Sequence, residues 1–131
     1  MAAKSYTLDN SIINFFLRAD VTGETSPATV EVALYTVAPT ASGGGTEVST
    51  VGTGYARQVI TFDAPVNGVT QNSALVTFPV ATLLWGTVVA AAIHDQGSGN
   101  MLYFGNLSAS KTIDPGDTAS FAAGTLSITE Q

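Results

Sequence analysis

Apolar and polar residues alternate along two stretches in the middle of the chain, which is the pattern of β-strands. In the first stretch, Val30–Tyr35, every second residue is a large aliphatic one, as expected for a half-buried strand. Pro39 ends this stretch, because proline has no N–H to donate to a sheet and fixes its own φ. The alternation resumes at residues 55–62. We therefore predict two strands joined by a long glycine-rich loop at residues 38–54.

Further strand patterns follow in the second half of the chain. Residues 86–94 are apolar on both faces, which predicts a central strand, and residues 95–100 form a hairpin loop that leads into a returning strand at 101–107. Asn67-Gly68 and the later Asp-Pro-Gly-Asp sequence are turn signals. About eight strands at this spacing are typical of an antiparallel sandwich or barrel. The pattern therefore predicts an all-β fold over residues from about 30 to 130.

One helix is predicted ahead of the strands, at residues 5–18. Its apolar side contains Leu8, Ile12, Phe15 and Phe16. Thr7 is the expected N-cap, with Asp9 in the first turn and Arg18 in the last, where their charges suit the helix dipole. We expect this amphipathic helix to cover an open edge or end of the β core; contact with a membrane or a partner is the alternative.

The composition narrows the class of protein. At 131 residues the chain is predicted to be a single domain, residues 1–131, and it contains no cysteine for a disulfide or a thiolate metal site. Charged residues make up 11%, against about 25% in an average soluble domain, so much of the surface is covered by small polar residues or by another protein. We take this as an indication of oligomerisation.

The charge and the hydropathy exclude several kinds of partner. The net charge is −6, with only four lysines and arginines, too few for a basic patch that binds nucleic acid or anionic lipid. No apolar run approaches the length of about 20 residues that spans a bilayer. Asp9 and Asn10 interrupt the first apolar stretch, which is too short for a signal peptide, so we expect the protein to be made and left in a cytoplasm.

Candidate chemistry is sparse. His94 beside Asp95 is the obvious general base, but no nucleophile motif accompanies it, so we expect Asp95 to begin a turn. Residues 108–111 match the Ser-x-x-Lys motif without its companion motifs, and we interpret them as a loop. Asp114 and Asp117 suit a turn better than a Ca²⁺ site, which takes six to eight oxygen ligands. We predict no catalytic residue, cofactor, metal or small-molecule substrate, and thus no enzyme.

The large aromatic residues have two possible roles. They could form a carbohydrate-binding platform, but their places on predicted strands and at a corner favour packing in the core or at a subunit interface. The residues concerned are Tyr35, Tyr55, Trp85 and Tyr103.

Several consecutive phrases of the sequence, taken together, resemble a family of small virion proteins of tailed bacteriophages. They are VEVALYTVAPTASGGGTEVS, GYARQVITF, NGVTQNSALVTFPVAT, WGTV, AAIHDQGSGNMLYFGNL and KTIDPGDTASFAAGTLSITEQ. The likeness covers nearly the whole chain in the same order. Ala90–Ala92 and His94 stand where the family is expected to have bulkier, more apolar residues.

The resemblance implies a fold, an assembly and a place in the phage. Members of the family look like tail fibre or capsid decoration proteins without catalytic residues. The implied fold is a jelly-roll-like β-sandwich that oligomerises, as a homotrimer, on the virion. We favour a capsid decoration (cement) protein that binds the major capsid protein, because the chain is small and shows no shaft or stem. The alternative is a tail or tail-fibre component that binds a host receptor.

We also expect the glycine-rich loop and the strand after it to meet a neighbouring subunit. A loop this long in a compact protein is usually functional. We predict that it forms an arm that becomes ordered only against another subunit in the virion. The candidate intersubunit contacts are Gly43, Gly44, Gly45, Thr46, Glu47, Val48, Tyr55 and Arg57.

Overall fold

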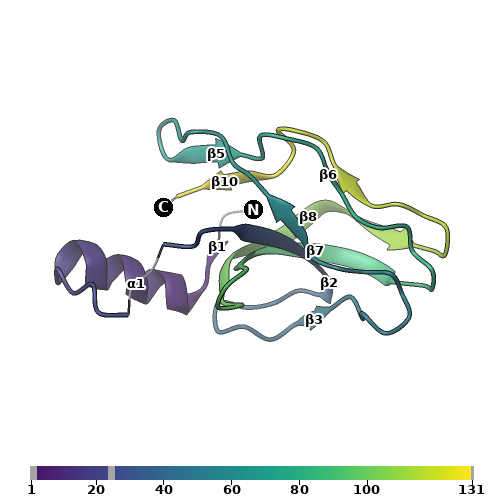
Figure 1. The fold of residues 1–131 in the computed structure, drawn as a ribbon, viewed down its shortest axis with the longest axis horizontal. Coiled ribbons are helices and arrows are strands. Elements are labelled where there is room, and N and C mark those ends of the chain that lie inside the picture. Colours follow the sequence, from purple (N-terminus) through teal and green to yellow (C-terminus); the bar gives the residue numbers. More distant parts are fainter. Residues whose placement is uncertain (1–2, 24–25, 131) are drawn as a thin grey trace.

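The computed structural model describes residues 3–23 and 26–130, which form one helix and ten strands. The strands make two antiparallel layers (Figure 1), so the predicted all-β sandwich with an N-terminal helix is confirmed. The elements are β1 (Ala3–Lys4), α1 (Tyr6–Leu17), β2 (Val30–Val37), β3 (Thr46–Glu47), β4 (Gln58–Ile60), β5 (Val69–Gln71), β6 (Val76–Thr77), β7 (Gly86–Asp95), β8 (Met101–Ile113), β9 (Ser120–Phe121) and β10 (Ser127–Thr129).

The large sheet has the order β1-β8-β7-β2-β3, and β4 also pairs with β2. β7 lies between β8 and β2, which confirms the central strand that its apolar pattern predicts. The hairpin between β7 and β8 closes as expected, with Asp95 accepting hydrogen bonds from the backbone N–H of Gly97 and the hydroxyl of Ser98. Asp95 is therefore a turn residue.

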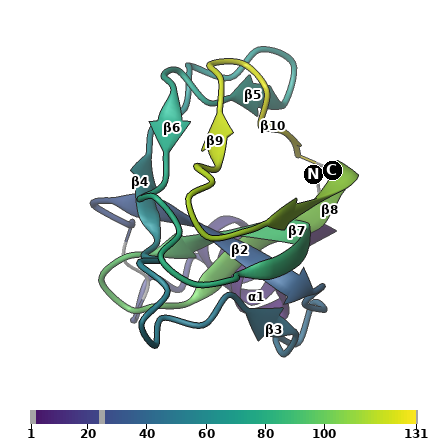
Figure 2. The ribbon, with the colours of Figure 1, turned by 90° about the vertical axis from the view of Figure 1, so that its right-hand side faces the viewer.

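The second layer consists of two short ladders, β10-β5 and β6-β9, which face the large sheet (Figure 2). The turn before β5 is the one that Asn67-Gly68 predicts: both residues have positive φ, 52° and 77°, as a type I′ hairpin turn requires. The core fills the space between the layers. Stacked and edge-on aromatic rings form its centre, with centroids 5.3–6.3 Å apart; they belong to Tyr55, Phe78, Trp85 and Phe121.

The outer face of the large sheet is also buried, which differs from the half-buried strand expected at β2. Ala33 and Tyr35 on β2 and Ala90 and Ala92 on β7 are at most 5% exposed and form a second apolar cluster. Ala38, from the segment after β2, packs against this cluster. β2 is therefore covered on both faces, because the glycine-rich segment folds back over the sheet instead of extending from it.

Helix α1 begins and packs differently from the expectation. Its N-cap is Ser5, whose Oγ accepts a hydrogen bond from the N–H of Leu8 at 3.2 Å, so the assignment of Thr7 as the cap is wrong. The backbone N–H of Ser5 is bonded to Leu102 in β8, and this pairing fixes where the helix starts. None of the residues Tyr6–Leu17 is fully buried, and Phe16 is 73% exposed. The helix rests on β8 with only part of its apolar surface.

The expected loop at residues 108–111 is wrong as well. These residues continue β8, where Lys111 pairs with Val88 of β7. The stretch is polar because its side chains are exposed and no further strand pairs with this half of β8 among the described residues. Lysine and small polar residues are typical of such sheet edges.

Candidate functional site

The glycine-rich segment forms a compact turn against the outer face of the large sheet. Thr40 and Gly43 exchange two backbone hydrogen bonds of 2.8 and 2.9 Å, and the N–H of Tyr6 is bonded to the carbonyl of Ala41 at 2.9 Å. β3 then pairs with β2. The segment is thus held by its own chain, and the expectation that it becomes ordered only against a neighbour is not met in the single chain.

Gly45 shows why this turn needs glycine. Its φ is +74°, and a Cβ built there would lie 2.6 Å from the carbonyl oxygen of Val37. Gly43 and Gly44 also have positive φ, but a Cβ on either would meet open space. Gly45 therefore permits a close backbone approach, whereas Gly43 and Gly44 supply only the left-handed conformation.

The strand after this turn positions Glu47 against Arg57. Nε and Nη2 of Arg57 donate to the two carboxylate oxygens of Glu47, both at 2.9 Å, in the bidentate geometry typical of strong pairs. Nη1 of Arg57 lies 3.4 Å from Oε1 of Glu31 on β2. The hydroxyl of Tyr55 donates to Glu47 at 2.7 Å and accepts from the N–H of Leu34 at 3.0 Å. Residues of three segments, β2, β3 and the segment before β4, are therefore joined in one network.

This network shifts the pKa values of its members. Burial would raise the pKa of Glu47, but the hydrogen bonds from Arg57 and Tyr55 outweigh it, and the pKa lies below the ordinary value. The hydrogen bond to Glu47 raises the pKa of Arg57, and burial raises the pKa of Tyr55. Glu47 and Arg57 are thus a charged pair and Tyr55 a neutral phenol at neutral pH.

Beside this network, Tyr35 and His94 pair on the same face of the sheet. The Tyr35 hydroxyl lies 2.9 Å from Nε2 of His94, and Nδ1 lies 3.0 Å from the carbonyl oxygen of Gly99. Because a carbonyl only accepts, a neutral His94 carries its proton on Nδ1 and accepts from Tyr35 at Nε2. Both ring nitrogens are therefore engaged, and Nδ1 meets a backbone carbonyl instead of the carboxylate of a catalytic triad.

Burial lowers the pKa of His94 and raises that of Tyr35. A pocket of about 430 Å³ opens over the pair. Its wall includes Gly43, Gly44 and Ser42 of the turn and Tyr6 of α1. Hydroxyl groups and backbone atoms surround this opening. It can accept hydrogen bonds and offer them, and the hydroxyl that meets the imidazole is that of Tyr35.

The structure brings some of the predicted contact residues together and separates others. Glu47, Tyr55 and Arg57 share one network, and Gly43 and Gly44 line the pocket beside it. Val48 and Tyr55, however, are 3% and 4% exposed in the chain's own core. Their side chains are already packed, so a neighbouring subunit would meet the exposed Gly44, Gly45 and Thr46 instead.

The sequence did not single out Glu31 as a partner of Arg57, and it singled out Tyr35 only as a large aromatic residue, not as the partner of His94. The only available signal was the strand alternation, which places both on one face together with Ala33. It could not show that His94 is opposite Glu31 in the ladder. The aromatic residues Tyr35, Tyr55 and Trp85 are buried, as their expected packing requires, and Tyr103 is half-buried.

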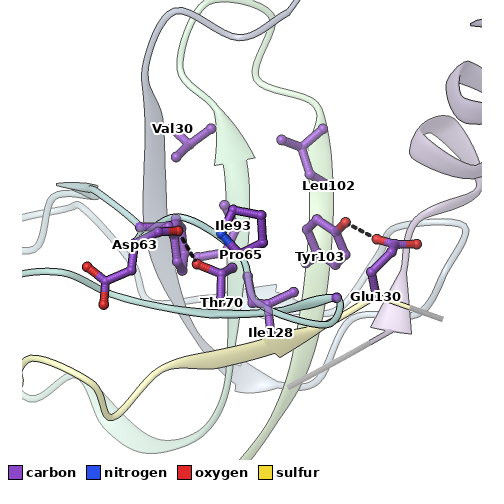
Figure 3. Close-up of a pocket in the computed structure, with 11 residues that line it drawn as sticks. Val30, Asp63, Pro65, Thr70, Ile93, Leu102, Tyr103, Ile128 and Glu130 are labelled. Atoms are coloured by element: carbon purple, nitrogen blue, oxygen red, sulfur yellow. Dashed lines mark hydrogen bonds between the residues drawn. The ribbon is translucent and has the colours of Figure 1, made fainter.

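A second pocket, of about 500 Å³, opens between the two layers at the end of the sandwich near α1 (Figure 3). Its lining is almost wholly apolar, with Ile93 of β7 and Ile128 of β10 on opposite sides. At the rim, the Tyr103 hydroxyl donates to Glu130, and Lys4 pairs with the same carboxylate. No sequence motif marks this pocket, because its walls come from segments that are far apart in the chain.

The described residues offer little else for cofactor chemistry. Among residues 3–23 and 26–130, no three His, Asp or Glu side chains gather in a way that could hold a metal ion. Asp117 instead accepts a hydrogen bond from the N–H of Asp114 at 2.9 Å, as a turn residue does. Within the same residues, no helix has the length and apolarity to cross a membrane.

Comparison with known protein families gives a match over nearly the whole chain. The family model described as Gp80, podophage GP4 fiber I protein gp80, matches residues 3–129. No curated protein is similar enough to the chain to be matched. The match covers both layers of the sandwich and α1, and it agrees with the phage virion family that the sequence resembles.

Proposed function

Because the chain belongs to the family of podophage GP4 fiber I protein gp80, a family of phage virion structural proteins, we propose that it is a fibre subunit. The family description, which names a fiber protein and applies to residues 3–129, is the observation that carries this proposal. This description favours a fibre protein. The small size of the chain, taken alone, favours a capsid decoration protein. In this role the protein holds other virion proteins and catalyses no reaction.

The surface of the molecule supports a role in assembly. Charged residues are few, and large apolar side chains are exposed at both ends of the sandwich, such as Phe16 at 73% and Val51 at 81%. A surface of this kind is unfavourable in water and is typical of protein–protein contacts. We infer self-association, as a homotrimer, with the exposed part of the glycine-rich turn, Gly44–Thr46, at one of the contacts.

Capsid decoration is the second candidate, with the major capsid protein as partner. A specific observation favours it: both layers of the described chain share one compact core, without an extended shaft. A short sandwich of this shape can sit on a shell as readily as at the base or tip of a fibre. In either case the protein acts on the virion, without nucleic acid, cofactor or small-molecule substrate.

A difference map between two virions separates the candidates. Phage particles made without this chain, and particles supplied with it in trans, are compared by cryo-electron microscopy. The fibre proposal expects the extra density in fibres that leave the particle. Extra density over the junctions of capsomers would reject the fibre proposal and support decoration. Equal density in both maps would reject both candidates, because the chain would then be no part of the virion.

A further inference from the structure

Helix α1 is apolar over a broad, continuous part of its surface, and only a portion of that part is packed. Leu8 and Ile12 face the body and are partly buried. Next to them Ile13, Phe16 and Leu17 are 47%, 73% and 80% exposed, at the spacing i, i+3 and i+4. The apolar part of an amphipathic helix normally packs against another element. The outer stripe, Ile13-Phe16-Leu17, therefore lacks a partner in the single chain.

The pocket between the layers is the matching unfilled feature. It measures about 500 Å³, and Val30, Phe62 and Leu102 complete the apolar lining around Ile93 and Ile128 (Figure 3). Grooves of this kind bind amphipathic helices through anchors at i, i+3 and i+4. The outer stripe of α1 supplies anchors of that spacing. Its own chain cannot use them, because α1 rests on β8 with its inner side (Figure 1).

The charges next to the two features are complementary. Arg18 follows Leu17 directly at the end of the helix; its side chain is 63% exposed, donates to Asn14 at 2.7 Å and lies 3.9 Å from the carboxylate of Asp20. Asp63 lines the pocket, and its carboxylate points outward at the rim, with Gln71 at 3.4 Å (Figure 3). Glu130 is a second acidic residue on the rim, and it forms an ion pair with Lys4 of its own chain. The rim thus offers an exposed carboxylate to a cation that arrives beside the apolar anchors.

We propose that the outer stripe of α1 from one copy of this chain docks into the pocket between the layers of a second copy, with Arg18 beside Asp63. The contact joins two different surfaces at the same end of the molecule, so copies either dock reciprocally as a two-fold dimer or follow one another in a closed ring or an open chain. The inference deepens the self-association proposed above and identifies its surfaces. It does not depend on whether the protein lies in a fibre or on the capsid.

Cysteine cross-linking tests the proposed contact, since the chain has no cysteine of its own. We use the purified full chain as two single variants, Leu17→Cys in the outer stripe and Thr70→Cys in the pocket lining. Mild oxidation of their mixture is expected to give a disulfide between the two variants, resolved by mass spectrometry. Neither variant alone is expected to form more than a trace of disulfide dimer.

The matched control is Val51→Cys, mixed with Thr70→Cys in the same way. Val51 is as exposed as Leu17, but it lies near the start of β7, seven residues and about 23 Å along the strand from the pocket residue Ile93. This mixture is expected to cross-link no faster than chance collisions allow. Efficient dimers of Leu17→Cys alone would overturn the proposal, because they would mean that helix pairs with helix.

Charge reversal supplies a test that does not depend on oxidation. Arg18→Glu and Asp63→Lys each place like charges across the proposed contact, so each is expected to weaken self-association about tenfold. The double variant restores the attraction and is expected to associate nearly as well as the wild type. Sedimentation measures the self-association of the wild type and of each variant, and circular dichroism checks that each variant is folded.

Two further results would reject the proposal. One is a wild-type chain that stays monomeric at its highest soluble concentration, which would leave the pocket to an unrelated protein or an apolar small molecule. The other is a double variant whose self-association is weakened by as much as the effects of the two single substitutions added together. Neither result would contradict the fibre assignment, which the density maps of the virion test separately.

Discussion

Asn72 holds the second layer together through hydrogen bonds that no strand ladder provides. Its side chain is 1% exposed; Nδ2 donates to the carbonyl oxygens of Ala74 and Ala122, and Oδ1 accepts from the N–H of Leu126, all at 2.9–3.0 Å. The two short ladders of this layer do not pair with each other. The side-chain amide of Asn72 thus links the segment between β5 and β6 to the segment that connects β9 to β10.

We therefore expect Asn72→Ala to lower the free energy of unfolding by about 3 kcal/mol, because it removes three hydrogen bonds and leaves the buried N–H of Leu126 without its partner. Urea denaturation followed by tryptophan fluorescence measures the change, since Trp85 is in the core. Asn106→Ala, an exposed residue of the same type on β8, is the control and should change stability little. An equal, small effect of both substitutions would show that these hydrogen bonds contribute little.

His94 makes stability depend on pH in a narrow range. Burial lowers its pKa in the folded state below the ordinary 6.5, so the unfolded chain binds a proton first as the pH falls. Stability is then complete above pH 6.5 and declines below it, until the folded state is protonated as well. Arg57, Glu47, Glu31 and Tyr35 are the charged or titratable groups near the ring.

The decline is expected in the wild type and absent in His94→Gln, which keeps a polar side chain but does not titrate. Urea midpoints measured in steps from pH 7.5 to pH 5 compare the two proteins. The pKa values of Glu47 and Glu130 are lowered from 4.5, so these carboxylates are charged throughout that range. Parallel curves for the two proteins would show that another group causes the pH dependence.

At the scale of elements, the pair Glu47–Arg57 ties β3 to the segment before β4. Both side chains are about one-quarter exposed, so water screens them only in part. We expect Arg57→Met to lower the free energy of unfolding by about 2 kcal/mol, because Glu47 stays partly buried without its bidentate partner. Arg18→Met, at an exposed site, is the matched control.

A double-mutant cycle with Glu47→Gln and Arg57→Met isolates the pair itself. The coupling energy is expected to be about 1–2 kcal/mol, since the two hydrogen bonds are lost together once either partner changes. Denaturation in urea at low and moderate salt gives the four stabilities that the cycle needs. A coupling energy near zero would mean that β3 is held by its backbone pairing with β2 alone.

The sequence predicted the elements whose patterns are purely local. The apolar run of β7, the hairpin after Asp95 and the Asn67-Gly68 turn all have signals within a few residues, and the structure confirms each. The polar half of β8 was missed, because an edge strand needs no alternation of apolar residues. The cap at Ser5 was missed because the pairing of β1 with β8, which is remote in sequence, sets the start of the helix.

The candidate site was predicted less completely than the fold. Strand alternation could place Glu31 and Tyr35 on one face, but only the register of β2 against β7 brings His94 to them. The second pocket opens between two layers that pack face to face, and no residue pattern marks it, because its walls come from segments far apart in the chain. Val48 and Tyr55 were assigned to a subunit contact because a sequence does not show which side chains the chain's own core will take.

For the molecule as a whole, the apolar outer stripe of α1 and the open pocket lie at the same end of the sandwich, and both remain exposed in a single chain. An association that covers both stabilises the folded state, because the unfolded chain cannot make the contact. The melting temperature is then expected to rise by a few degrees when the protein concentration is raised a hundredfold. A folded protein that does not associate shows no such dependence.

Leu17→Ser combined with Arg18→Glu should remove the concentration dependence while leaving the melting temperature of the dilute protein nearly unchanged. Both side chains are largely exposed in the single chain, so their loss alters no core contact. Differential scanning calorimetry over a dilution series measures both quantities. If the double variant melts much lower than the wild type even at high dilution, the helix stabilises its own chain and the outer stripe is not a docking surface. If the wild type shows no concentration dependence, the two apolar features are not covered by a second copy.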